Sequence, residues 1–123
     1  MHFMKRILFL GYTDFSERMK ASSLQHELKK QGYDCYIIEQ PCYALDIGEI
    51  VLHPEIEVTT NLPDIKLPEP FILFCGMGGE VLDTALTICR GNTRAVLTPS
   101  NAKMNPYTLS KHLLEEKKAM NHE

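Results

Sequence analysis

Residues 71–79 read F-I-L-F-C-G-M-G-G, a continuous apolar run that opens into a turn rich in glycine. A short apolar run bounded in this way is typical of a strand that is buried on both faces of a sheet. Residues 6–11, R-I-L-F-L-G, have the same form and predict a second buried strand. The two runs together indicate a sheet that helices cover on both sides.

Helical and strand patterns alternate around these two runs. Gly32 and Gly91 end helical stretches, and Asn105-Pro106 supplies an N-cap followed by a first-turn proline. Aromatic and β-branched residues mark two further strands. The predicted elements are, in order, a strand at 6–11, a helix ending at 31, a strand at 33–39, a short helix at 44–52, a strand at 71–75, a helix at 80–90, a strand at 94–98 and a helix from 106 with Leu109, Leu113 and Met120 facing inward.

The stretch 53–70 contains Pro54, Pro63, Pro68 and Pro70. Proline fixes its own backbone angle and removes a hydrogen-bond donor, so four of them exclude a regular helix or a central strand. We predict a long loop, with a short extended piece at 57–60. Loops of this length are either functional flaps or mobile segments.

Strands that alternate with helices favour a parallel sheet, because parallel neighbours are joined by right-handed crossovers. We therefore predict one α/β domain over residues 1–123, with a mainly parallel four-stranded sheet and helices on both faces. With the strands numbered along the chain, the expected order is 2-1-3-4. A chain of 123 residues has room for one such core.

This topology predicts a binding site where the winding of the chain reverses, between the first and third strands. Ligands of open α/β sheets bind in the crevice outside the carboxyl ends of the strands at such a point. The candidate ligand-binding residues are those that follow the first, third and fourth strands: Gly11, Tyr12, Thr13, Asp14, Cys75, Gly76, Met77, Gly78, Gly79, Thr98, Ser100 and Asn101.

Each group of candidate residues also has a structural explanation. The glycine turn at 76–79 lets backbone N–H groups face an anion at a helix N-terminus, and it serves equally well as a plain turn. Asp14 has the character of a helix cap. The polar side chains at 98–101 can bind a ligand or the local backbone. The sequence leaves these alternatives open.

Cys75 supports a different hypothesis, a small enzyme with a cysteine nucleophile. A thiol at a strand end beside a helix N-terminus has its thiolate favoured by the helix dipole. The run 72–79 is similar to the phosphorylated-cysteine loop of sugar-phosphotransferase IIB domains. In that family the cysteine lies on the first strand and its loop carries hydroxyl residues, and this chain departs from both features.

Composition excludes several classes of protein. The net charge of -3 and the scattered Lys and Arg residues give no basic stripe, so we expect no nucleic-acid partner. No apolar run has the about 18 to 20 residues that a membrane span needs, so we expect a cytoplasmic protein without membrane contact. The four cysteines and five histidines show no metal-ligand spacing, and we expect neither a metal nor another cofactor.

The carboxyl-terminal half resembles a family of small proteins of unknown function, DUF3783, found mostly in Firmicutes. The resemblance lies in the strand I-L-F-C-G at 72–76, the segment R-A-V-L-T-P-S-N at 94–101, and the leucines and glutamates at 109–116. Met104 stands where an aromatic residue is expected, and Lys117 stands where histidine is expected. The resemblance implies a compact α/β fold and assigns no catalytic residue.

Three functional hypotheses follow. The first is a non-catalytic binding or regulatory module that holds a small anionic or polar ligand, or a protein partner, at the carboxyl ends of the strands. The second is the enzyme with Cys75 as nucleophile. The third is a purely structural homo-oligomer, for example a homodimer, that forms through an exposed apolar strip on the proline-rich segment or on the last helix.

Overall fold

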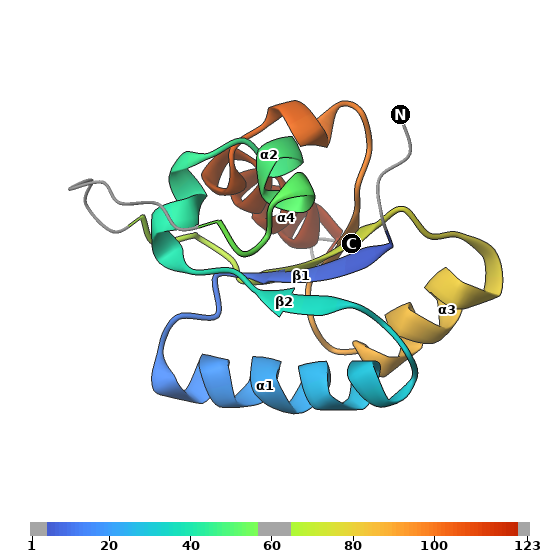
Figure 1. Ribbon diagram of the computed structural model, residues 1–123. Coiled ribbons are helices and arrows are strands. Elements are labelled where there is room, and N and C mark those ends of the chain that lie inside the picture. The colour runs from blue at the N-terminus through green and yellow to red at the C-terminus, as the bar shows by residue number, and fades with distance from the viewer. Residues whose placement is uncertain (1–4, 57–64, 121–123) are drawn as a thin grey trace.

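The computed structural model describes residues 5–56 and 65–120, which form a four-stranded sheet between two layers of helices (Figure 1). The extended piece expected at 57–60 lies outside these residues. The elements are, in order, β1 (Arg6–Leu10), α1 (Phe15–Lys30), β2 (Cys35–Ile37), the 3-10 helix η1 (Gln40–Ala44), α2 (Ile47–Leu52), β3 (Phe71–Cys75), α3 (Gly79–Ile88), β4 (Arg94–Val96), the 3-10 helix η2 (Asn101–Lys103) and α4 (Pro106–Met120).

Side chains of the two central strands alternate between the two faces of the sheet, as a strand period of two requires. Leu8 and Leu73 pack with η1, α2 and α4 on one face. Phe9 and Phe74 pack with α1 and α3 on the other. Figure 1 shows the same arrangement, with α1 and α3 below the sheet and α2 and α4 above it. The sequence therefore predicted the α/β class and the two covered faces correctly.

The inward face of α4 was predicted correctly for its first part only. Leu109 is buried and Leu113 packs against the core, but Met120 is 76% exposed. A 15-residue helix is about 22 Å long, whereas a five-residue strand spans about 17 Å. The last turn of α4 runs past the sheet, and Met120 has no core to enter.

The strand order is β2-β1-β3-β4, as expected, but the direction of one half was predicted wrongly. β1 pairs in parallel with β2, and β3 pairs in parallel with β4. β1 and β3, however, are antiparallel, with Arg6 opposite Cys75 and Leu10 opposite Phe71. The sheet is mixed, and its two βαβ units run in opposite directions.

The direction of β3 follows from the route of the chain between β2 and β3. The Arg6 guanidinium donates to the carbonyl oxygens of Val51 and Leu52, so α2 ends beside the start of β1. Pro70 lies against Gly11, at the other end of β1. The chain leaves α2 beside the amino end of β1 and enters β3 beside the carboxyl end of β1. β3 therefore runs antiparallel to β1, whereas a single helical crossover from β2 would have made it parallel.

The turn after β1 has room for glycine only. Gly11 has φ +89°, and a Cβ atom added to it would lie 2.8 Å from Pro70 Cα. The Gly11 N–H donates to the buried Tyr43 hydroxyl over 2.7 Å, and this hydroxyl donates in turn to the Ile38 carbonyl over 3.3 Å. Tyr43 therefore joins the ends of β1 and β2 to η1.

Replacing Gly11 tests the close approach of Pro70. We expect Gly11→Ala to lower the free energy of unfolding by about 2 kcal/mol or more, because it adds an unfavourable backbone conformation to a steric clash. The matched control is Gly32→Ala, which has φ +88° and open space around the added Cβ. Denaturant titration of both variants measures the difference, and equal losses would contradict the role of Pro70.

Removing the Tyr43 hydroxyl tests the second contact. Tyr43→Phe leaves the buried Gly11 N–H without its acceptor, so we expect a loss of about 1–3 kcal/mol in the free energy of unfolding. Tyr36→Phe is the control, because among the described residues the Tyr36 hydroxyl bonds only to the exposed Asp34 carboxylate, and its loss costs about 0.5 kcal/mol or less. Similar small losses in both variants would show that Tyr43 acts through packing alone.

Candidate functional site

The antiparallel pairing of β1 and β3 separates the residues that the sequence placed in one crevice. The segment 11–14 lies at the carboxyl end of β1, and the segment 75–79 lies at the opposite end of the strands, beside the amino end of β1. Residues 98–101 lie at the same end as 75–79, because β4 is parallel to β3. The expected crevice between the first and third strands is therefore absent from the described fold.

At the carboxyl end of β1, the predicted residues make structural contacts. Asp14 caps α1: its Oδ1 accepts from the Glu17 N–H over 2.7 Å, and Glu17 Oε1 accepts from the Asp14 N–H over 3.3 Å. Thr13 accepts at its carbonyl from Arg18 Nε. Tyr12 is buried against Phe9, its hydroxyl lies 3.4 Å from Asn92 Oδ1, and burial raises its pKa.

At the carboxyl end of β4, the polar residues of the turn at 98–101 bind one another. Asn101 Oδ1 accepts from the Thr98 N–H over 2.8 Å, and Thr98 Oγ1 accepts from the Asn101 N–H over 3.1 Å. The Asn101 amide nitrogen also donates to the Val96 carbonyl over 3.0 Å. Ser100 is exposed beside them. The backbone explanation, which the sequence left open, accounts for Thr98 and Asn101.

The glycine turn after β3 leads directly into α3. Gly76 and Gly79 have φ of +67° and +57°, and Gly78 is the N-cap of α3 without a side-chain cap. Met77 packs against the core between α1 and α3. Residues 76–79 carry no cationic side chain of their own, and Glu80 adds a negative charge to the first turn of the helix.

Cys75 lies in the core. Its side chain has 0% exposure, and burial raises the pKa of its thiol to about 12, although nearby Arg6 acts in the opposite direction. The thiol is therefore protonated at neutral pH, whereas a nucleophilic cysteine needs an accessible thiolate. The placement of Cys75 gives the enzyme hypothesis no support.

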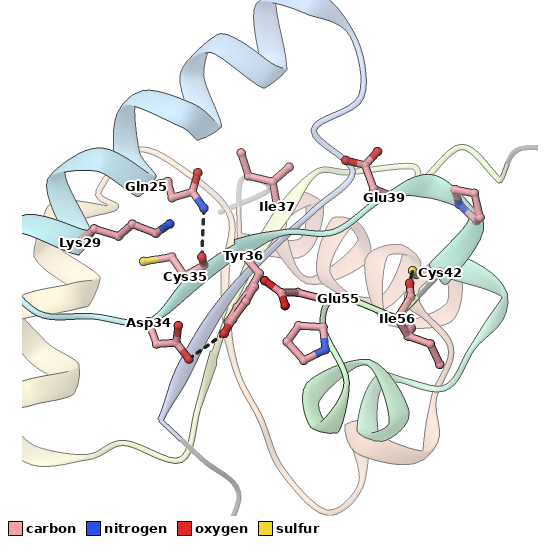
Figure 2. Close-up of a pocket in the computed structure, with 12 residues that line it drawn as sticks. Gln25, Lys29, Asp34, Cys35, Tyr36, Ile37, Glu39, Cys42, Glu55 and Ile56 are labelled. Carbon is pink, nitrogen blue, oxygen red and sulfur yellow. Dashed lines mark hydrogen bonds between the residues drawn. The ribbon is translucent and has the colours of Figure 1, made fainter. Parts of the chain in front are cut away.

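A hollow that could hold a ligand lies elsewhere. A groove of about 860 Å³ runs along the free edge of β2, and we call it the β2 groove (Figure 2). None of the residues predicted from the sequence lines it. The lining residues are Gln25, Lys29, Asp34, Cys35, Tyr36, Ile37, Glu39, Pro41, Cys42, Pro54, Glu55 and Ile56.

Four segments form the β2 groove: α1, β2, η1 and the turn after α2. Gln25 and Lys29 of α1 stand on one side of β2, and the turn that follows α2 places Glu55 and Ile56 on the other (Figure 2). β2 itself forms the floor. The Cys42 thiol donates to the Ile56 carbonyl over 3.3 Å, which fixes this turn against η1.

The floor of the groove is a sheet edge with outward-facing backbone groups. β2 bonds to β1 through the Asp34 carbonyl and the Ile38 N–H. In a parallel ladder, alternate residues of a strand direct their peptide groups toward the neighbouring strand, and the residues between them direct theirs away. In β2 the residues that point away from β1 are Cys35 and Ile37. Gln25 Nε2 already donates to the Cys35 carbonyl over 2.9 Å, so within residues 5–56 and 65–120 the open edge consists of the Cys35 N–H and the two peptide groups of Ile37.

The charges around the β2 groove are mostly negative. Asp34, Glu39 and Glu55 line it, against Lys29 alone. Asp34 lies 3.6 Å from Arg6, and Glu39 pairs with Arg18 over 2.8 Å. Within residues 5–56 and 65–120, Glu55 has no ion pair. The arrangement suits a ligand that carries positive charge beside Glu55.

Sequence reasoning missed this groove although one signal for it was present. The order 2-1-3-4 leaves the second strand at an edge, and an edge strand exposes a row of backbone donors and acceptors. The glycine turns gave the stronger signal, and they lie elsewhere.

In the part of the chain that the structure describes, no three His, Cys, Asp or Glu side chains gather as metal ligands. None of the helices described there combines the length and the apolar content of a membrane span.

Comparison with known families adds one finding. Residues 70–120 match the family described as Domain of unknown function (DUF3783). This part of the chain is DUF3783-like. No curated protein and no solved structure matches the chain at a significant level.

The DUF3783-like part contains β3, α3, β4, η2 and α4, so it includes the turns at the carboxyl ends of β3 and β4. The β2 groove lies outside it, between residues 25 and 56. A smaller hollow of about 340 Å³ within the DUF3783-like part is lined by the predicted residues Thr98, Ser100 and Asn101 together with residues of β4 and α4.

The buried thiols generate a pH prediction. Burial raises the pKa of Cys35 and Cys75 to about 12 and that of Cys89 to about 11, from an ordinary value of 9.0. Above pH 9 the unfolded chain loses these protons while the folded chain keeps them. We therefore expect the free energy of unfolding to fall between pH 9 and 12, by up to about 1.4 kcal/mol per pH unit for each thiol.

Urea titrations at a series of pH values measure this loss, and Cys75→Ala serves as the control because it removes one of the contributing thiols. An unfolding free energy that stays constant from pH 8 to 11 would contradict the prediction. Alkylation at neutral pH checks the same burial, since the native thiols should react no faster than the chain unfolds.

Proposed function

We propose that this protein is a non-catalytic binding module that holds an extended segment of a partner protein in the β2 groove. The observation that carries the proposal is the open edge at Ile37, which lies on the floor of the groove. Extended peptides bind such edges by adding a strand, with backbone hydrogen bonds for affinity and side-chain contacts for specificity.

The size and shape of the groove support this occupant. A volume of about 860 Å³ falls within the range of about 300–1,000 Å³ that is usual for ligand sites. Its lining includes β2 from Cys35 to Ile37, with side chains of α1 on one side of the strand and of the turn after α2 on the other (Figure 2). Alternate side chains of an added strand would face these two sides in turn.

The charges select the partner. Its segment is expected to carry basic side chains on the face that meets Glu55, since Glu55 forms no ion pair within the described residues, although Arg6 lines an adjoining hollow with it, and two further carboxylates line the groove. A lysine or arginine there gains from a partly enclosed site, where charge attraction is stronger than in open water. Opposite, Lys29 favours an acidic or polar side chain.

Selection from a library of random linear peptides tests the proposal, with the purified chain as bait. We expect enriched peptides with Lys or Arg alternating with β-branched residues, and amide shifts at Cys35, Tyr36 and Ile37 when they bind. Ile37→Pro removes the outward N–H at a position where an edge strand accepts proline. It should weaken binding about tenfold, as the loss of one hydrogen bond predicts.

Charge variants complete the experiment. Glu55→Lys should weaken binding of the enriched basic peptides, whereas Glu115→Lys should leave it unchanged, because Glu115 is exposed on α4 away from the groove. The proposal fails if no peptide is enriched. It also fails if the enriched peptides bind the Ile37→Pro and Glu55→Lys variants as tightly as the original chain.

A further inference from the structure

The two halves of the chain have the same order of elements. The first contains β1, α1, β2, η1 and α2, and the second contains β3, α3, β4, η2 and α4. In both, a strand, a helix and a parallel strand are followed by a 3-10 helix and a last helix. The first helix of each half lies on one face of the sheet, and the last helix lies on the other (Figure 1).

The two halves also agree residue by residue at their centre. Residues 7–11 read I-L-F-L-G and residues 72–76 read I-L-F-C-G. The Ile7 N–H donates to the carbonyl of residue 34 over 2.8 Å, and the Ile72 N–H donates to that of residue 93 over 2.9 Å. At the other end of each pair of strands, the Phe9 and Phe74 carbonyls accept from equivalent N–H groups over 3.0 and 2.9 Å.

The register between β1 and β3 is the one that a two-fold axis requires. Ile7 lies opposite Phe74, and Phe9 lies opposite Ile72, so each equivalent pair meets the other in reverse order. The axis passes through the pair formed by Leu8 and Leu73. A one-residue shift in register would destroy this correspondence.

Contacts on the helical face that carries α2 and α4 are reciprocal as well. α2 contacts η2, and α4 contacts η1. In the first of these, Gly48 lies so close to Ala102 that an added Cβ would stand 3.1 Å from its carbonyl oxygen, and the Ile47 N–H donates to the Met104 carbonyl over 2.8 Å. Each half therefore covers part of the other.

We infer that residues 6–52 are a second, diverged copy of the unit in residues 71–120, and that β3, η2 and α4 form a pairing surface whose partner is another copy of the same unit. The DUF3783 match supports this division, because its span of 70–120 coincides with the second unit. The copies differ most in their helices: α1 has 16 residues against 10 in α3, and α2 has 6 against 15 in α4.

The strand side chains show that the second unit is complementary to itself. If β3 paired with another β3 in the present register, Ile72 would meet Phe74 of the other copy, and Phe74 would meet Ile72. These are the same types of pair that Ile72 forms with Phe9 and Phe74 forms with Ile7 in this chain. The central Leu–Leu pair would also be kept.

The experiment begins with the full chain carrying a protease site between residues 56 and 65. After folding and cleavage, the two pieces are unfolded, refolded together and examined by native mass spectrometry. We expect pairs of first and second pieces and, in addition, pairs of two second pieces. Pairs of the first kind show that the pieces refold. If they form while second-piece pairs are missing, the pairing surface is not homotypic.

A tandem chain, in which residues 65–120 replace residues 5–56, keeps the inference testable if the cleaved pieces do not refold. We expect it to fold as a symmetric molecule, in which equivalent amides of the two copies share one set of NMR resonances. An unfolded tandem chain, or two unlike sets of resonances, would overturn the inference. The β2 groove plays no part in either result, so failure here is distinct from failure of the proposed function.

Discussion

The fold depends on the antiparallel pairing of β1 with β3. The residues of both strands are fully buried except Arg6, so their backbone donors and acceptors have no access to water and must be satisfied by neighbouring strands. This pair fixes which strands stand at the edges of the sheet. It also fixes which turns lie together, because reversing a strand moves its carboxyl end to the other end of the neighbouring strands.

Local patterns in the sequence determine most elements, but not the direction of β3. Apolar runs and glycine stops placed the strands and most helices, and the order of strands followed from the crossovers. Direction depends on where the chain enters β3. This is set by two long-range contacts, from Arg6 to Val51 and from Gly11 to Pro70, which no short stretch of sequence contains.

The candidate site shows the same limit. Asp14, Thr98 and Asn101 have the polar groups that a ligand would use, but their partners turned out to be backbone atoms only a few residues away. The β2 groove is made by ordinary side chains from α1, β2, η1 and the turn after α2, so no motif marks it. The repeated I-L-F-x-G was visible in the sequence, and its meaning required the register of the sheet.

All four cysteines are free and shielded by the core, which governs how the protein responds to oxidants. Peroxide or glutathione disulfide attacks thiolates, and the fully buried thiols of Cys75 and Cys89 offer neither the charge nor the access that this chemistry needs. Oxidation at these two positions is thereby restricted to molecules that have already opened. Cys35 and Cys42 are also buried, but they line the β2 groove and lie closer to solvent.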